Sequence, residues 1–293
     1  MAFLNVDRAL PPQLWALVRL LSARQPLTDS QARALMSPDS LNAGMKSEPP
    51  FQPTVRTLLE LELVVQDESG KLSLCHAMPT LADFQQRLRE ALFAPARNTK
   101  LESDPITGNR DMTIVLCYFL NFDPLDPPIT RAQVDEQSAD RFSVEAKNPT
   151  PSNVRWPRFG HWAPMLGLAA APLIPASASD SGALTPDCTT AVRQVLAVAH
   201  AAGRTVPAVE LVRTIRQAIP VLPGGAYSTR LGIPDPGEQV VDPALSFALL
   251  RGCYEGWLRF ERFADSASTV TVADRDDPNR RVSDILVSEG ING

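Results

Sequence analysis

The spacing of apolar residues changes once within the first quarter of the chain, and this change restricts the possible folds more than any other feature. Over Pro11–Ala23, and again over Pro53–Leu61, apolar side chains recur every three or four residues, which predicts amphipathic helices. Thr28 lies where it can cap a second, shorter helix between them. From Leu63 to Leu74 the spacing falls to two around an Asp-Glu-Ser-Gly turn, which predicts a β-hairpin.

Three helices followed by a small hairpin are typical of a winged helix, a variant of the helix-turn-helix. We therefore expect residues 1–80 to form a winged-helix domain whose hairpin is the wing. A further helix is predicted over Leu81–Phe93, because its apolar residues keep the helical spacing. Residues 81–108 are expected to comprise this helix and a polar linker.

The same order of features recurs after the linker. Met112–Phe122 is apolar enough for a buried first helix, Thr130 opens a second helix, and Val154–Leu168 is expected to be the third. Ala171–Leu184 would form a hairpin around a Ser/Asp/Gly turn. Residues 109–186 are therefore predicted to be a second winged-helix-like domain.

A third round of the pattern occupies residues 187–293. Its predicted helices are Thr189–Ala202, Val206–Ile219 and Pro243–Tyr254. Trp257–Phe263 and Thr269–Val272 are predicted to pair as the clearest hairpin of the chain. The tail after Asp274 is polar, apart from the short apolar run Ile285–Val287.

The fold class that follows is mostly α with small β-hairpins, arranged as tandem winged-helix modules. Three rounds at a similar interval are the signature of an array built from one supersecondary unit. Residue identity between the rounds is low, and the middle round is the weakest. The alternative is a single winged helix joined to an unrelated, mostly helical domain.

Charge and hydropathy limit the class of protein further. The 293 residues carry a formal charge of −5, and 44% of them are hydrophobic, which is the balance of a globular protein. Net acidity excludes a generally basic coat for nucleic acid, although it does not exclude a local basic patch. The opening residues lack the features of a signal peptide, and no apolar stretch is long enough to cross a bilayer. We expect a cytoplasmic protein without a membrane partner.

The residues that usually carry catalysis do not form a recognisable pattern. His76, His161 and His200 lack metal-ligand spacing, and the four cysteines lie far apart, which argues against a zinc ribbon and against a disulfide-stapled domain. Neither a phosphate-binding P-loop nor a Gly-x-Ser-x-Gly nucleophile elbow occurs. We therefore expect no enzyme, no cofactor and no bound metal.

The most distinctive segment combines arginine with aromatic residues. If Val154–Leu168 is a recognition helix, Arg155 and Arg158 lie on one face near its start, from where they could reach phosphates or guanine edges. In the alternative interpretation, Trp156, Phe159 and Trp162 form a core stripe and the arginines extend along its margin. The sequence leaves both interpretations open for the arginines.

The other two units offer fewer basic candidates for DNA contact. Arg56 lies in the third helix of the first unit and Lys71 in its wing, while Arg259 and Arg262 lie around the hairpin of the third unit. Acidic residues such as Glu60, Glu62, Asp67 and Glu68 surround the first pair. An acidic wing would repel phosphate, so the first unit could dock protein instead. The small number of candidates predicts weak, salt-dependent binding to double-stranded DNA.

The tryptophan-rich segment and the helix start that follows it resemble one known family. The segment reads RWPRFGHWAPMLGL from Arg155, and Pro186-Asp187-Cys188-Thr189 opens the next helix. Together with Phe3-Leu4-Asn5 and an apolar helix after Leu10-Pro11, these motifs resemble DpdG-type proteins. Such proteins are found in bacterial gene islands that install 7-deazaguanine bases in DNA and restrict unmodified DNA. At Cys188 the chain departs from the family pattern, where we expect proline.

The resemblance spans most of the chain and implies an accessory, non-catalytic component of a DNA-modification or phage-defence system. Mixed charge on the predicted wings favours a scaffold that positions other proteins of the same operon on DNA. The alternative is a stand-alone winged-helix DNA-binding protein that resembles a transcriptional regulator.

Overall fold

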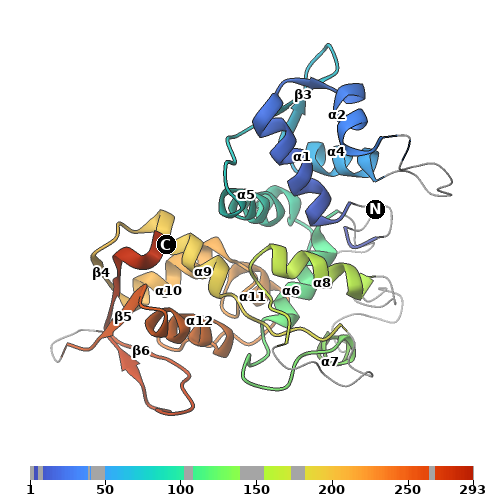
Figure 1. Cartoon of the computed structure of the whole chain (residues 1–293). Helices are drawn as coiled ribbons and strands as arrows, with labels where there is room; N and C mark the ends of the chain where they lie inside the picture. Colours follow the sequence, from blue (N-terminus) through green and yellow to red (C-terminus); the bar gives the residue numbers. More distant parts are fainter. Residues whose placement is uncertain are drawn as a thin grey trace.

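The computed structural model describes residues 3–5, 9–38, 40, 50–101, 108–138, 155–172, 182–263 and 268–292. Helices dominate, and the strands form small antiparallel sheets of two or three strands. The expectation of a mostly α protein with small β elements is therefore confirmed. The elements fall into a first unit, drawn in blue at the top of Figure 1, and two further units below it.

The first unit has the predicted order of elements, with one addition. Its elements are α1 (Pro11–Arg24), β1 (Leu27–Thr28), α2 (Asp29–Met36), α4 (Phe51–Glu60), β2 (Val64–Gln66) and β3 (Lys71–Leu74). The addition is β1, a short strand between the first two helices. It pairs with β3, so β3 lies between β1 and β2.

Local signals explain these elements. The hydroxyl of Thr28 accepts a hydrogen bond from the backbone N–H of Gln31 at 3.2 Å, so Thr28 caps α2 as predicted. In the hairpin turn, the Asp67 carboxylate accepts the backbone N–H groups of Ser69 and Lys71, both at 2.9 Å. Gly70 supplies the positive φ of +79° that closes the turn.

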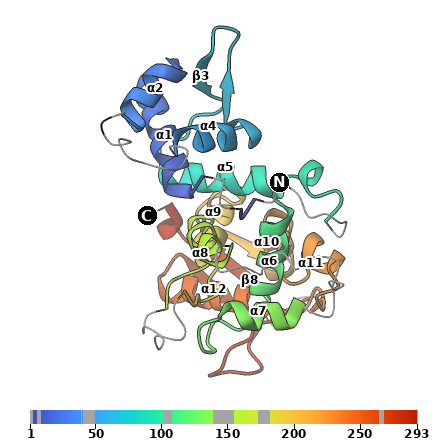
Figure 2. The same cartoon turned by 90° about the vertical axis from the view of Figure 1, so that its right-hand side faces the viewer.

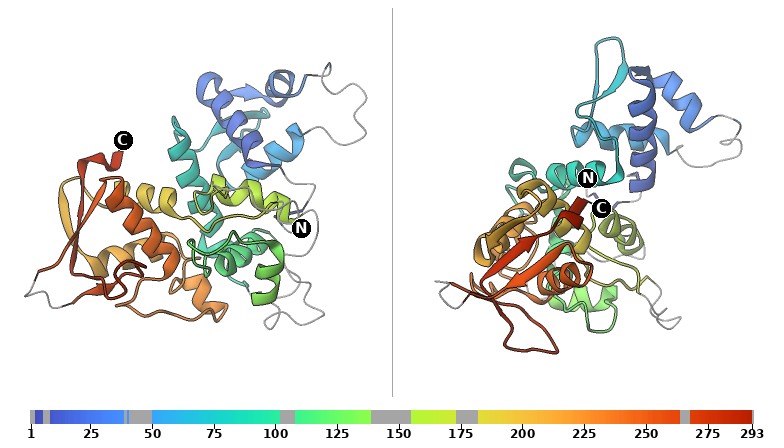
Figure 3. Two further views of the ribbon diagram at one scale, coloured as in Figure 1. Left: turned by 60° about the horizontal axis from the view of Figure 1, so that its bottom comes forward. Right: turned by 60° about the vertical axis from the view of Figure 1, so that its left-hand side comes forward.

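Helix α5 (Leu81–Phe93) lies between the first unit and the rest of the molecule, as Figures 2 and 3 show, and η1 (Pro95–Arg97) follows it. The buried Arg89 of α5 donates hydrogen bonds to the carbonyl of Leu166 at 2.9 Å and to the side chain of Gln194 at 2.7 Å. Burial lowers the pKa of Arg89 to about 10, so the guanidinium stays charged at neutral pH. Arg89 thus connects α5 to both of the other units.

The second unit consists of α6 (Arg110–Phe119), α7 (Arg131–Ser138) and α8 (Arg155–Met165). The described residues of this unit contain two antiparallel bridges, from Ile129 to Leu184 and from Ala170 to Thr185, and no longer strand. These bridges involve the two ends of the predicted hairpin. Residues 173–181, which include its turn, lie outside the described residues.

The third unit is the largest. Its elements are α9 (Thr189–Ala199), β4 (Arg204–Pro207), α10 (Ala208–Ala218), α11 (Ala226–Arg230), α12 (Pro243–Tyr254), β5 (Leu258–Glu261), β6 (Val270–Thr271), β7 (Arg281–Val282), β8 (Asp284–Val287) and η3 (Glu289–Asn292). One sheet has the strand order β4-β8-β5, and β6 pairs with β7 in a second sheet.

The hairpin predicted between Trp257–Phe263 and Thr269–Val272 is wrong. β5 pairs with β8, and β6 pairs with β7. The apolar run in the tail forms β8, where Ile285 and Val287 are fully buried. The central strand of a sheet is hydrogen-bonded along both edges and packs on the core, which favours an apolar strand. β8 therefore pairs with β5, although β6 is closer to β5 in the sequence.

One strand arrangement recurs in the three units. In each, the segment between the first and second helices pairs with the last segment of the unit. That last segment also pairs with the segment that follows α4, α8 or α12. This holds for β1-β3-β2 and for β4-β8-β5. In the second unit the bridges at Ile129, Leu184 and Ala170 follow the same order.

The units share one continuous core. It includes Leu14 and Leu58 from the first unit, Phe119 and Trp162 from the second and Trp257 from the third. Phe3 and Leu4, which precede the first unit, are also fully buried in it. None of the helices in the described ranges is both long and apolar enough to cross a bilayer.

Candidate functional site

The aromatic residues of α8 form part of the core. Trp156, Phe159 and Trp162 are all buried. The ring of Phe159 meets that of Phe119 edge-on at 5.3 Å between centroids, and Trp162 lies 4.5 Å from Phe3. Edge-on and tilted ring contacts of this kind stabilise packing. The interpretation of these three residues as a core stripe is therefore confirmed.

The two arginines of α8 lie at the margin of this stripe and contact the N-terminal segment. Arg155 donates to the side-chain oxygen of Asn5 at 3.1 Å, and Arg158 donates to the carbonyl of Ala9 at 3.3 Å. Both side chains are half-buried. The part of α8 that carries them is therefore turned toward the protein's own chain, and DNA contact by these arginines stays a prediction.

The candidates of the first unit are exposed among acidic residues. Arg56 and Glu60 are the exposed side chains of α4, and Lys71 begins β3. Glu62 pairs with Arg97 at 2.9 Å. The pKa of the Asp67 carboxyl in the β2–β3 hairpin is lowered by hydrogen bonds from the Ser69 hydroxyl and the Lys71 backbone. Asp67 therefore stays negatively charged at neutral pH, and a phosphate backbone would meet both signs of charge here.

The third unit also mixes its charges. Arg259 is exposed on β5 and pairs with Glu261 at 2.7 Å. In the sheet, Arg259 lies opposite Leu286 of β8, which lies opposite Thr205 of β4. The outer row of the sheet is thus Thr205, Leu286 and Arg259. Arg262, which is exposed just after β5, completes the basic candidates here, and the structure does not bring these residues into one continuous basic face.

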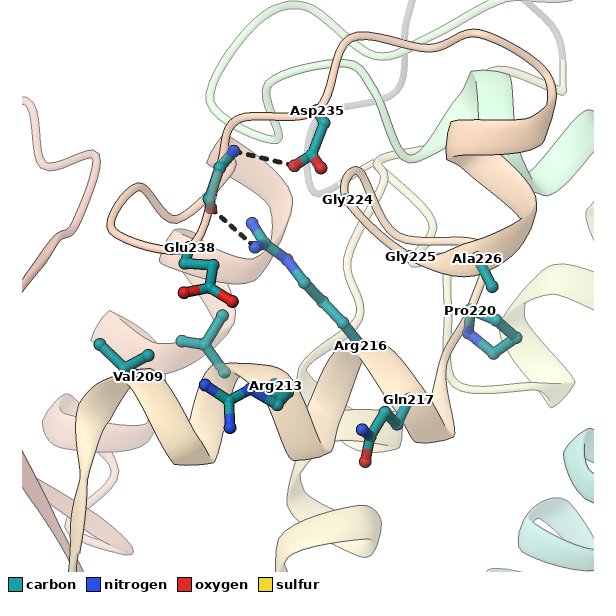
Figure 4. Close-up of a pocket in the computed structure, with 12 residues that line it drawn as sticks. Val209, Arg213, Arg216, Gln217, Pro220, Gly224, Gly225, Ala226, Asp235 and Glu238 are labelled. Carbon is teal, nitrogen blue, oxygen red and sulfur yellow. Dashed lines mark hydrogen bonds between the residues drawn. The ribbon is translucent and has the colours of Figure 1, made fainter.

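A cavity of about 380 Å³ lies beside α10, where Figure 4 shows Arg216 extending from the helix toward a loop. Arg216 donates hydrogen bonds to the carbonyls of Gly237 and Val240, both at 3.0 Å. A Cβ atom at Gly224 would lie 3.0 Å from the guanidinium carbon, so only glycine fits there without a shift. Arg216 therefore organises this loop.

The charges around this cavity balance. Arg213 and Arg216 line it together with Asp235 and Glu238. Arg216 also lies 3.6 Å from the fully buried carboxylate of Asp242. Burial raises the pKa of Asp242 to about 6, although its hydrogen bond from the backbone of Leu245 and the nearby guanidinium oppose the shift. The arrangement holds a loop in place and offers no excess of positive charge to a phosphate.

Reactive groups do not converge elsewhere within the described ranges. No group of three His, Cys, Asp or Glu side chains there could hold a metal ion. Burial raises the pKa of the Cys117 and Cys188 thiols well above the ordinary value. Both cysteines are therefore uncharged at neutral pH and poor nucleophiles.

The model of the family described as DpdG-like matches residues 1–266. The chain belongs to the DpdG-like family. The match extends through β5 of the third unit and ends before β6. No curated protein and no solved structure matches the chain significantly.

In this DpdG-like chain, the two motifs that carry the resemblance meet in space. The carbonyl of Gly167 at the end of the first motif accepts the backbone N–H of Ala191 at 3.2 Å. Asp187 of the second motif accepts the backbone N–H of Thr189 and a hydrogen bond from Arg251 of α12, both at 2.8 Å. Cys188 is fully buried, and its thiol lies 3.4 Å from the carbonyl of Ala244, a hydrogen bond that proline could not make.

Sequence reasoning missed several residues of this DpdG-like chain that organise the structure. Asp111, Arg216 and Asp242 are buried ionisable residues. In the sequence, Arg216 is only one of several arginines of the third unit, and Asp111 and Asp242 are not recognisable as buried. Only Asp242 had a local signal, because an Asp-Pro pair before an apolar run is typical of a helix start. The partners of Asp111 and Arg216 are distant in sequence, so no local pattern could have identified them.

Proposed function

We propose that this protein is a non-catalytic accessory subunit of a bacterial DNA-modification or phage-defence system, and that it scaffolds other proteins of its operon on DNA. Membership of the DpdG-like family supports the biological setting. Among the described residues, no group of three His, Cys, Asp or Glu side chains could hold a catalytic metal ion, and the sequence contains no recognised catalytic motif, which favours a role in assembly. Turnover of a nucleotide or nucleic acid by the pure chain would contradict the non-catalytic role.

We further propose that the three units are winged-helix modules. The recurring strand order supports this, because β1-β3-β2 and β4-β8-β5 place the last strand between the other two. In such a module the third helix and the wing are the surfaces that meet DNA or a partner. The helices in this position are α4, α8 and α12, and in the third unit the short helix α11 precedes α12.

The exposed side chains of these three helices carry the functional argument. α4 exposes Arg56 beside Glu60, and α8 has no exposed arginine or lysine. α12 exposes Arg251, which is paired with Asp187 and Glu255 at 2.8 Å each. A high-affinity, independent DNA-binding module presents a basic face. These helices favour protein docking, with DNA contact limited to a few phosphate contacts.

The test is a fluorescence-polarisation titration of the full chain with duplex DNA at two salt concentrations, beside co-purification with the neighbouring gene products. We expect weak DNA binding that falls steeply with salt, and a stable protein complex. The double variant Arg56→Ala/Lys71→Ala should weaken DNA binding further, with Arg19→Ala as an exposed control. Tight DNA binding without any protein complex would contradict the scaffold.

The alternative function is a stand-alone DNA-binding protein of the transcriptional-regulator type. The position of the first unit favours it, because its hairpin projects away from the other units in Figures 1 and 2. This alternative predicts a preferred DNA sequence that one unit recognises alone. Selection from a random duplex library distinguishes the two, since a scaffold with few phosphate contacts enriches no sequence.

A further inference from the structure

Helix α12 is apolar on two opposite faces. One face packs against α9 and β5 and contains Ala244, Leu245, Ala248, Leu249 and Gly252, all buried. The other face contains Pro243, Phe247, Leu250 and Tyr254, which fall on one side of the helix because they are spaced by three and four residues. Phe247 and Leu250 are half-buried, while Tyr254 is 93% exposed.

A groove of about 280 Å³ runs beside this second face. Phe247 and Leu250 line it together with Leu125, which precedes α7 and is 47% exposed. A helix that is apolar all round is normally buried on all sides. On the outer face of α12, by contrast, Tyr254 is exposed to solvent.

The loops that border the groove are acidic. Residues 123–126 and 273–280 supply five carboxylates and two guanidiniums. Arg275 pairs with Asp123 at 3.2 Å and with Asp126 at 2.8 Å, and Arg280 pairs with Asp274 at 2.7 Å. Asp277 lies 3.9 Å from Arg280, and both Asp276 and Asp277 are exposed. The rim therefore has excess negative charge, which repels a phosphate backbone and attracts lysine or arginine.

We propose that Phe247, Leu250 and Tyr254, with Leu125, form the docking site for an amphipathic helix of a partner protein that carries lysine or arginine beside its apolar face. The proposal rests on the scaffold function and specifies the chemistry of one partner. Apolar anchors inside a charged rim are the usual anatomy of a protein–protein contact, and helix-in-groove binding uses the same residue spacing. On this proposal, α12 of the third unit binds a partner protein, although a helix in its position could also contact DNA.

Site-specific photo-crosslinking tests the site in the full chain. The change Tyr254→p-benzoylphenylalanine places a crosslinker on an exposed position, and Glu210→p-benzoylphenylalanine on α10 is the matched exposed control. Both variants are expressed in cells together with the neighbouring genes and irradiated. We expect one discrete protein adduct at position 254 and none at position 210, with the crosslinked segment amphipathic and rich in Lys and Arg. No adduct at position 254, or an adduct with nucleic acid, would overturn the proposal.

A second pair of variants tests the charge of the rim. Asp276→Lys/Asp277→Lys should lower the adduct yield at position 254 by about threefold or more, because it reverses two exposed rim charges. Glu68→Lys, on the wing of the first unit, should leave the yield unchanged. If the adduct yield at position 254 is the same in Asp276→Lys/Asp277→Lys and in Glu68→Lys, the prediction of a basic partner is wrong.

A third crosslinker at Val65 of the first unit separates this proposal from the scaffold function. Val65 is 45% exposed on β2. A protein adduct at Val65 without one at Tyr254 would be consistent with the scaffold function and would contradict the docking site on α12. Absence of protein adducts at both positions would contradict the docking site and the scaffold together.

Discussion

The carboxylate of Asp111 accepts the backbone N–H of Leu4 at a distance of 2.7 Å. The same carboxylate accepts the N–H of Phe3 at 3.0 Å, and the Asn5 side chain accepts a hydrogen bond from Arg155. The N-terminal segment is thus fastened to α6 and α8 before the first unit begins. This relationship explains why the Phe3-Leu4-Asn5 motif belongs with the tryptophan-rich motif.

Asp111→Ala should destabilise the protein by about 2–4 kcal/mol, because it leaves the buried N–H groups of Phe3, Leu4 and Met112 without this acceptor. Glu68→Ala is the exposed acidic control and should change stability by less than about 0.5 kcal/mol. Urea unfolding measures both. Equal stability of Asp111→Ala and wild type would show that the N-terminal segment is not held by this carboxylate.

The pH dependence of stability should report on Asp242. Its folded pKa of about 6 lies above the ordinary value of 3.8, so the folded state binds the proton more tightly than the unfolded state. The stability contributed by the protonated group is therefore present below about pH 4 and is lost as pH rises through about 6, by at most about 3 kcal/mol. Asp242→Asn should flatten this part of the curve. A wild-type curve without any fall between pH 4 and 6.5 would contradict the assignment.

Gly167 should tolerate no side chain. Its φ is +69°, and an added Cβ would lie 3.0 Å from the backbone nitrogen of Ala191 and 3.1 Å from Thr190. Gly167→Ala should cost about 2–4 kcal/mol, since it adds a close contact to the left-handed backbone. Gly203→Ala is the matched control, because Gly203 has a φ of +81° with open space around it, and it should cost about 1 kcal/mol. If thermal unfolding shows the same loss of stability for Gly167→Ala and Gly203→Ala, the predicted close contact with Ala191 and Thr190 is wrong.

Arg89 should hold α5 against the other two units. Arg89→Met removes its hydrogen bonds to Leu166 and Gln194, and we expect a loss of about 2–3 kcal/mol because the Leu166 carbonyl then stays buried without its partner. Arg87→Met on the same helix removes an exposed pair with Glu90 and should cost less than about 1 kcal/mol. Hydrogen exchange should show faster exchange in α5 for Arg89→Met only. Matching exchange in both variants would refute this role of Arg89.

The helices could be predicted closely from the sequence. The predicted bounds of α5 and α12 agree with the structure, and Thr28 caps α2 as expected. These features depend on residues within a few positions of one another, so their spacing and capping are visible in the sequence. The burial of Trp156, Phe159 and Trp162 belongs to the same class of local pattern.

Strand pairing and the contacts of charged residues depended on the tertiary structure. β5 pairs with β8 and not with β6, the next strand in the sequence. The reason is that Ile285 and Val287 of β8 have the apolar side chains that the centre of the sheet buries. The contacts of Arg155 and Arg158 with Asn5 and Ala9 join residues about 150 positions apart, so no local pattern could show them. The spacing of apolar residues is a local pattern within one or two helical turns, so the helices were determined by the sequence alone. Partners that lie far along the chain are selected by burial in the assembled core, and only the folded molecule decides them.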